Sequence, residues 1–342
     1  MQEMNSALGA GTPDGSVAPG ARRGALRSTA TLAQDYLVLV MIAVLVLITA
    51  AVEPKFLLRA NLVNIMRQFG PLIMVSMGMT FVIIGGFIDL SVAGTINLVA
   101  VVTISLIQPL GQVPALLIGL AIGAVCGLLN AVVILSSGAL TQAEALFLTF
   151  GMSTVFSAFA LLYSHGSTMH FWDIEASKSV FEGIGGGNLG PLSVSFVMFL
   201  SCLVVLWIFQ EKTVEGRYIR LTGGNKTAAR LAGVNVSRAI VLIYTLCGFM
   251  TGVGAIVLFS RITTAAPVIG AGYETNAILA VVVGGTTLLG GKGSVVRTVM
   301  GVLLVILMSN CLDLLNVSTY LQVAVKGAIL VLAIWLDNRK RV

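Results

Sequence analysis

The sequence contains few charged residues and few of the side chains on which enzymes depend. Charged residues make up 10% of the 342 residues and hydrophobic residues 57%, whereas soluble domains carry about 25% and roughly 45–50%. Only two histidines occur, His165 and His170. Their spacing is a poor metal signature, so we interpret them as surface residues. The composition excludes a soluble globular protein.

Paired cysteines and phosphate-binding loops are absent as well. The four cysteines lie singly in apolar runs, so we interpret them as small buried residues: Cys126, Cys202, Cys247 and Cys311. The segment 290–294 (Gly-Gly-Lys-Gly-Ser) lacks the Gly-Lys-Ser/Thr triplet of a Walker-type loop. The sequence also shows no nucleophile–base pair and no metal-ligand cluster. We therefore predict that the chain is not an enzyme, binds no cofactor itself and relies on another chain for any ATP hydrolysis.

What the sequence has instead is a series of apolar segments long enough to cross a bilayer as helices, for which about 17–25 residues are needed. Some are short or interrupted by glycine. The ten candidate segments are 36–52, 71–86, 94–110, 114–136, 145–164, 192–209, 239–260, 276–289, 295–314 and 321–336. The 38 glycines predict close contacts between helices. The predicted fold is an all-α polytopic membrane protein with about ten transmembrane helices.

The basic residues predict the orientation of these helices. With both termini in the cytosol, the inside segments hold 14 of the 20 basic residues, as the positive-inside rule requires. Residues 1–33 are then a disordered cytosolic tail, 34–338 the transmembrane domain and 339–342 a basic cytosolic C-terminus. The loop 164–191, with three acidic residues and one lysine, falls outside. Three basic residues between the first two segments disagree with this orientation: Lys55, Arg59 and Arg67.

A polar island at residues 211–238 interrupts the apolar segments and contains six basic residues. Because such a segment cannot lie in hydrocarbon, it faces water, and the orientation above places it in the cytosol. We expect Asn225 to cap a short helix over 226–231 and Gly233 to end it in a left-handed conformation. Gly223 and Gly224 permit a sharp turn before it. The alternative is an ordinary basic loop.

Two glycine-interrupted segments, 82–94 and 281–293, match at five positions at an offset of 199 residues. Such segments in the two halves of a transporter indicate discontinuous helices and an internal repeat. Glycine is abundant enough in this chain for chance to supply part of the match.

Polar side chains beside these segments are candidates for a translocation path. Asp89 and Ser91 form one group, and Glu274 and Asn276 form the other. A charge at membrane depth is costly unless it is paired or lines a cavity, so it marks a functional site. Both groups also admit a structural reading, in which the side chains stabilise the start of the next helix.

Three blocks of sequence resemble the permease subunits of bacterial ATP-binding-cassette sugar importers of the ribose type. The first contains Ile88-Asp-Leu-Ser-Val92. The second is the island stretch 216–234, which resembles the cytosolic coupling segment of that family. The third is 277–294, with Gly-Gly-Thr-Thr-Leu-Leu-Gly-Gly-Lys-Gly-Ser at its end. The resemblance covers roughly residues 36–338.

The resemblance implies a permease in the bacterial inner membrane that imports a monosaccharide or related polyol. Its implied partners are two cytosolic ATP-binding subunits carrying ATP and Mg²⁺, a second permease copy or paralogue, an extracytoplasmic solute-binding protein and membrane lipid, with no nucleic acid. The residues implied to couple to the ATPase are Gly216, Arg217, Tyr218, Gly224, Asn225, Ala228, Ala229, Arg230 and Gly233.

The chain departs from the family pattern near segments that would line the path, and the solute therefore stays open. Phe87 and Ala93 stand where the family has glycine, Ala145 where relatives often carry proline, and Asn276 where aspartate is frequent; Glu144 is an unusual neighbour. The main alternative is a secondary transporter with Asp89 as its ion site. A purely structural membrane protein is a third, which leaves the island unexplained.

Overall fold

The computed structural model describes residues 39–339, so the predicted tail 1–33 and residues 340–342 lie outside the described chain. Seven helices are long and apolar enough to cross a membrane: α2 (Arg59–Ile84), α3 (Val92–Leu110), α4 (Gln112–Ser137), α5 (Gln142–Ser164), α7 (Val194–Lys212), α10 (Val236–Ile262) and α12 (Val295–Leu314). Three shorter apolar helices are Leu39–Val52, α11 (Tyr273–Val283) and the segment Thr319–Trp335 of α13 (Thr319–Arg339). The all-α polytopic class is thereby confirmed, whereas the count of ten spans and their orientation stay predictions.

The remaining elements are short and lie in the connections. They are η1 (Pro54–Leu57), η2 (Phe171–Asp173), α6 (Ser179–Gly186), α8 (Val214–Gly224) and α9 (Lys226–Leu231). Two antiparallel pairs of two-residue strands join β1 (Met169–His170) to β4 (Thr264–Ala265), and β2 (Asn188–Leu189) to β3 (Leu192–Ser193).

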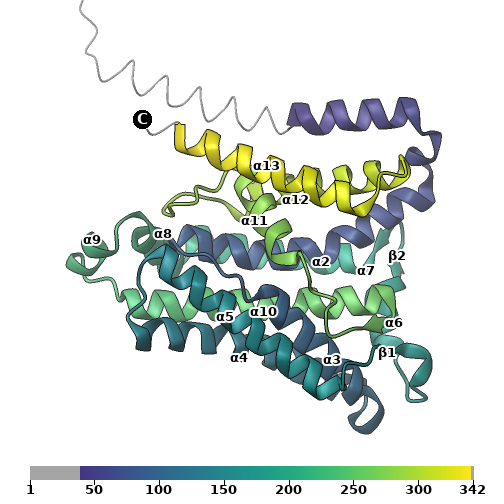
Figure 1. The fold of residues 1–342 in the computed structure, drawn as a ribbon, viewed down its shortest axis with the longest axis horizontal. Coiled ribbons are helices and arrows are strands. Elements are labelled where there is room, and N and C mark those ends of the chain that lie inside the picture. Colours follow the sequence, from purple (N-terminus) through teal and green to yellow (C-terminus); the bar gives the residue numbers. More distant parts are fainter. Residues whose placement is uncertain (1–38, 340–342) are drawn as a thin grey trace, which may run out of the picture.

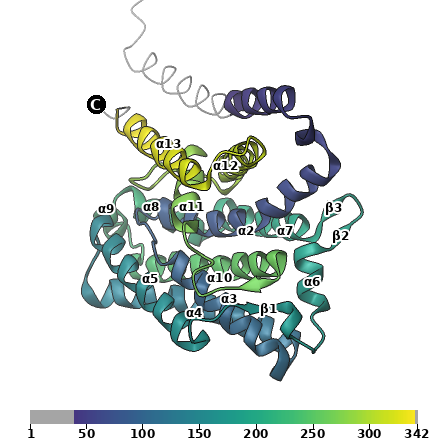
Figure 2. The same ribbon diagram turned by 45° about the vertical axis from the view of Figure 1, so that its right-hand side comes forward.

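α2 and α10 form the centre of the bundle (Figures 1 and 2). In the most apolar part of α2, 89% of residues are buried, against 22% in α5 and in α7. α4 packs closely on α10 because glycines on both helices let the backbones approach. A Cβ on Gly127 would lie 2.1 Å from the Tyr244 carbonyl oxygen, and one on Gly248 would lie 2.3 Å from the Gly123 oxygen. The predicted glycine-mediated helix contacts are therefore present.

Two helix boundaries differ from the predicted spans by six residues or more. α2 begins at Arg59, twelve residues before the predicted start at Pro71, and continues through that proline. Its polar first turns looked like a loop, but they are used inside the fold: Arg67 donates to the Gly186 carbonyl (2.6 Å), and Asn61 donates to the Asn310 side chain (3.0 Å). α11 ends at Val283, six residues before the predicted end, because Gly284 and Gly285 break it.

The connections gather at two ends of the bundle. At one end, which we call the island end, Lys226 of the polar island donates to the carbonyl of Leu140 between α4 and α5. At the opposite end, which we call the far end, Gln112 accepts a hydrogen bond from the Val180 amide (2.8 Å), and Gln108 accepts one from the Ala176 amide (2.9 Å). The predicted outside loop and the polar island are therefore separated by the length of the bundle.

Candidate functional site

The polar island folds into two helices at the island end, where α9 projects beyond the long helices (Figure 1). Thr213 begins α8, because its hydroxyl accepts a hydrogen bond from the Gly216 amide (3.1 Å). The Asn225 side chain begins α9 by accepting from the Ala228 amide (3.0 Å). The Asn225-capped helix over 226–231 is confirmed, and a further helix, α8, precedes it.

α9 ends in a Schellman motif, in which a residue with positive φ lets two amides reach back to carbonyls of the last turn. Gly233 has φ +80°, as expected for the left-handed conformation. Its amide donates to the Arg230 carbonyl (3.0 Å), and the Val234 amide donates to the Ala229 carbonyl (3.0 Å). Ala229 and Val234, the apolar pair typical of this motif, are both buried. The short helix is therefore fixed at both ends.

Two ion pairs attach α8 to the long helices on either side of it. Arg220 pairs with Glu211 at the end of α7. Arg238 at the start of α10 pairs with Glu215 of α8 (2.9 Å). Exposed pairs of this kind contribute about 0–1 kcal/mol each. The two ion pairs therefore act mainly by fixing the position of α8 between α7 and α10.

Glycines from three distant parts of the chain meet at the end of α8. We call this the glycine junction, and it consists of residues 84–86, 223–224 and 290–291. A Cβ on Gly223 would lie 1.8 Å from the Ile84 carbonyl oxygen, and one on Gly290 would lie 2.7 Å from the Cα of Gly86. The Gly291 amide donates to the Ile84 carbonyl (2.8 Å). The end of α8 therefore contacts the end of α2 and the loop after α11 directly, backbone against backbone.

Lys226, the first residue of α9, makes a second contact with the same region. Its ammonium lies 3.7 Å from the ring centroid of Phe87 and donates to the Leu140 carbonyl. Burial lowers the pKa of Lys226, while the nearby Glu144 carboxylate opposes that shift. Phe87 supplies the aromatic face for this cation–π contact.

α2 and α11 end in the same way. At the end of α2, the Gly86 amide donates to Ile83 (2.9 Å) and the Phe87 amide to Val82 (3.1 Å). The same two hydrogen bonds recur 199 residues later, at the end of α11. There the Gly285 amide donates to the Val282 carbonyl (2.9 Å) and the Thr286 amide to the Val281 carbonyl (3.2 Å). Gly86 and Gly285 have φ of +79° and +89°. The matched glycines therefore mark two equivalent helix ends.

The coupling residues implied by the resemblance fall into two groups. Gly216 and Ala229 are buried and Tyr218 is half-buried, so they support the island from within; the exposed ones are Arg217, Gly224, Asn225, Ala228, Arg230 and Gly233. Sequence reasoning missed Leu231, which is 86% exposed at the end of α9. An apolar residue beside a predicted Gly233 cap, in an otherwise polar segment, was the available signal.

The first group of candidate path residues is buried within the protomer. The Asp89 carboxylate accepts hydrogen bonds from the Ser91 amide (2.8 Å) and hydroxyl (2.6 Å), and Asn130 donates to the same hydroxyl (2.6 Å). Asp89 and Ser91 are each 1% exposed. This geometry supports the structural reading, in which the pair shapes the turn that begins α3.

The second group lies elsewhere, at the start of α11. Glu274 and Asn276 are half-buried. One oxygen of Glu274 is buried without a hydrogen-bond partner among the described residues. Asn276 lines a cavity between α2 and α10–α13. The structure therefore does not bring the two groups of candidate path residues together.

The described residues offer no catalytic constellation. Across residues 39–339, no group of three or more His, Cys, Asp or Glu side chains could hold a metal. The cysteines in this part of the chain are free thiols; Cys126, Cys247 and Cys311 are buried as expected, whereas Cys202 is only half-buried. The site is instead a projecting helix whose base contacts the end of α2 and the loop after α11.

Comparison with known proteins agrees with this geometry. Residues 61–334 match the family described as the permease component of the branched-chain amino acid transport system. The ribose import permease protein RbsC of Escherichia coli K12 is 36% identical over 310 residues, which cover 89% of this chain and 93% of that protein. RbsC of Bacillus subtilis is 35% identical over 298 residues, covering 87% and 90%.

A further relative carries a different name. The autoinducer 2 import system permease protein LsrD of Photorhabdus luminescens is 33% identical over 272 residues, covering 76% of this chain and 78% of that protein. No solved structure matches the chain. The family match and the seven apolar helices make the chain a multi-pass protein of the bacterial inner membrane. It belongs to this family of permease components and is a transport subunit rather than an enzyme.

Proposed function

We propose that the chain is the permease of a binding-protein-dependent importer for a monosaccharide or related polyol, and that α8 and α9 receive the ATP-binding subunits. The relatives named for ribose and autoinducer 2 import support a small sugar-like solute. The island 211–238 then faces the cytosol, and the loop 164–191 faces a solute-binding protein outside. ATP and Mg²⁺ act on the partner subunits.

One observation carries this proposal: α9 presents Leu231 at 86% exposure on a projecting helix, while the base of the island is fixed at the glycine junction. An exposed apolar side chain on a polar segment is a typical anchor for a partner's pocket. Through the junction, a displacement of α8 would push directly on the end of α2 and on the loop after α11.

The mechanism follows from these contacts. When the ATP-binding subunits approach each other, they shift α9, and the shift passes to α8 through Asn225, whose amide donates to the Leu221 carbonyl of α8 (3.1 Å) while its side chain caps α9. The movement reaches the interior at the Ile84 carbonyl and the Gly291 amide. Packed elements respond by switching between discrete arrangements rather than by bending smoothly. Opening of the path to one side and then the other is the expected result.

The path itself runs between this chain and a second permease, either an identical copy or a paralogue, in surrounding lipid. Of the candidate path residues, Glu274 and Asn276 are the better placed, because they stand at the start of a short helix at membrane depth. Asp89 and Ser91 act on the path through the start of α3. The ion-coupled alternative lacks support in the described residues, because the Ser91 amide and hydroxyl that bind Asp89 belong to that turn.

Replacement of Leu231 tests the docking surface. Leu231→Asp places a charge in the proposed contact without touching the core, so the ATP-binding subunits should no longer copurify with the permease. Leu189→Asp is the matched control, because Leu189 is a 58% exposed leucine in the loop at the far end. Undiminished copurification of the ATPase with Leu231→Asp, at normal membrane insertion, would contradict the proposal.

A further inference from the structure

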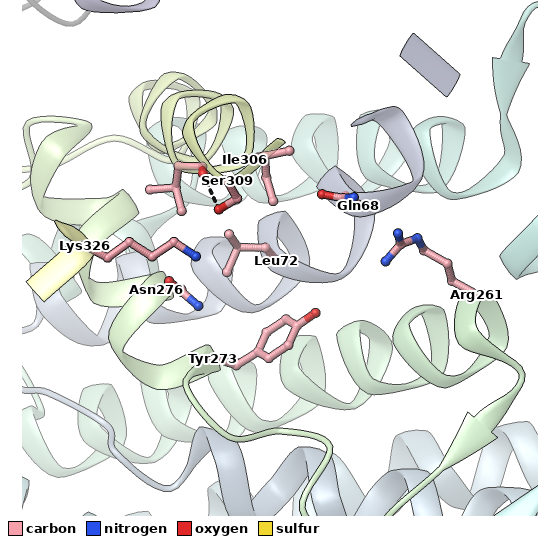
Figure 3. A pocket seen from close by; sticks show the side chains of 9 residues that line it. Gln68, Leu72, Arg261, Tyr273, Asn276, Ile306, Ser309 and Lys326 are labelled. Carbon is pink, nitrogen blue, oxygen red and sulfur yellow. Dashed lines mark hydrogen bonds between the residues drawn. The ribbon is translucent and has the colours of Figure 1, made fainter. Parts of the chain in front are cut away.

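A cavity of about 150 Å³ lies toward the far end of the bundle, between α2, α10, α11, α12 and α13. Figure 3 shows the side chains of Arg261 and Lys326 entering it from opposite sides. The other polar lining residues are Gln68, Tyr273, Asn276 and Ser309, and the lining has no carboxylate. Two cations therefore face one small space.

Neither cation is neutralised within the described chain. The ion pairs of Arg220 and Arg238 lie at the island end and do not reach the cavity. Arg261 donates to the Asn64 side chain (3.1 Å), and Lys326 makes no hydrogen bond with any described residue. Asp313 attracts Lys326 from α12 but is beyond ion-pair distance, and it accepts a hydrogen bond from Gln322 (2.8 Å).

Unpaired cations at membrane depth are expensive. A ligand that brings negative charge into the cavity would offset that cost. The start of α11 adds to the attraction, because Tyr273 is its first residue and its Gly272 N-cap supplies no side-chain cap, so the positive end of the helix dipole faces this region. Figure 3 shows the Tyr273 hydroxyl and the Asn276 amide beside the cations.

We propose that this cavity binds a phosphate group, with Arg261 and Lys326 as its charged ligands. The planar guanidinium and the ammonium are the side chains that bind phosphate oxygens most strongly. A cavity of roughly 150 Å³ holds benzene in an engineered protein, so this one admits a phosphate and little more. The phosphate belongs to a lipid headgroup or to a soluble molecule. The site lies within one protomer and is separate from the docking surface on α9.

Phosphate binding to the purified full chain in detergent tests the proposal. Thermal unfolding is measured against inorganic phosphate at constant ionic strength, because a ligand that binds only the folded state raises the midpoint with concentration. Lys326→Gln is the principal variant, since it removes the charge without breaking a hydrogen bond within the described chain. It should weaken phosphate binding at least tenfold. Lys55→Gln, at an exposed lysine of η1, is the matched control and should bind like the wild type.

A second arm identifies the source of the phosphate. Native mass spectrometry compares retention of phosphatidylglycerol with that of diacylglycerol, which lacks phosphate. Retained phosphatidylglycerol that inorganic phosphate displaces, and that Lys326→Gln loses, assigns the site to a lipid headgroup. Binding of inorganic phosphate without such retention assigns it to a soluble molecule. The proposal is overturned if the wild type binds neither, or if Lys326→Gln binds as tightly as the wild type.

Discussion

Substitution of Gly223 by alanine is the sharpest perturbation of the glycine junction. The new Cβ would lie 1.8 Å from the Ile84 carbonyl oxygen and 2.8 Å from the Gly291 amide nitrogen, and both neighbours are backbone atoms that cannot rotate away. The end of α8 must therefore move by about 1 Å or more. Overpacking of this kind costs typically 1–3 kcal/mol, and loss of the Gly291–Ile84 hydrogen bond adds about 1 kcal/mol.

The assay combines thermal unfolding with solute-stimulated ATP hydrolysis in the assembled transporter. Gly223→Ala should unfold at a lower temperature, and in the folded fraction solute should stimulate hydrolysis less, because α8 has lost its fixed contact with α2. Gly224→Ala is the matched control for stability, since a Cβ there meets no described atom within 4 Å. An unchanged unfolding midpoint for Gly223→Ala, or an equal loss in Gly224→Ala, would refute the reasoning.

Three further predictions concern single contacts. Asn225→Ala removes the α9 cap and should lower stability by about 1 kcal/mol, while Asn225→Ser should retain most of it; equal losses in denaturant unfolding would argue against capping. Phe87→Leu and Lys226→Met should show a coupling energy of about 0.5–1 kcal/mol in a double-mutant cycle, and strict additivity would exclude the cation–π contact. Gly127→Ala, whose Cβ would lie 2.1 Å from the Tyr244 carbonyl oxygen, should lower the unfolding midpoint, whereas Gly151→Ala, with no described atom within 4 Å, should not; the comparison fails if both behave alike.

Local signals in the sequence predicted α9 well. Asn225 and Gly233 act on backbone groups within a few residues of themselves, so their effect can be predicted without knowledge of the tertiary structure. The equivalent helix ends at Gly86 and Gly285 could be predicted from the sequence for the same reason. In each case a residue type with a special backbone preference determined the geometry.

Features that depend on distant contacts could not be predicted in this way. The glycine junction joins Ile84, Gly223 and Gly291, and nothing in the sequence states that these three positions meet. The first turns of α2 were missed because Asn61 and Arg67 look like loop residues until their partners in other elements are known. The candidate path residues were grouped by residue type, and the structure placed them in two separate environments.

The central claim is that an ATP-binding subunit contacts the exposed end of α9. The most direct measurement places a photo-crosslinking amino acid at Leu231 in the assembled transporter, with a second variant carrying it at Leu189 in the far-end loop. The account predicts a crosslink from position 231 to the ATP-binding subunit and none from position 189. A crosslink to that subunit from position 189, with none from position 231, would contradict the account.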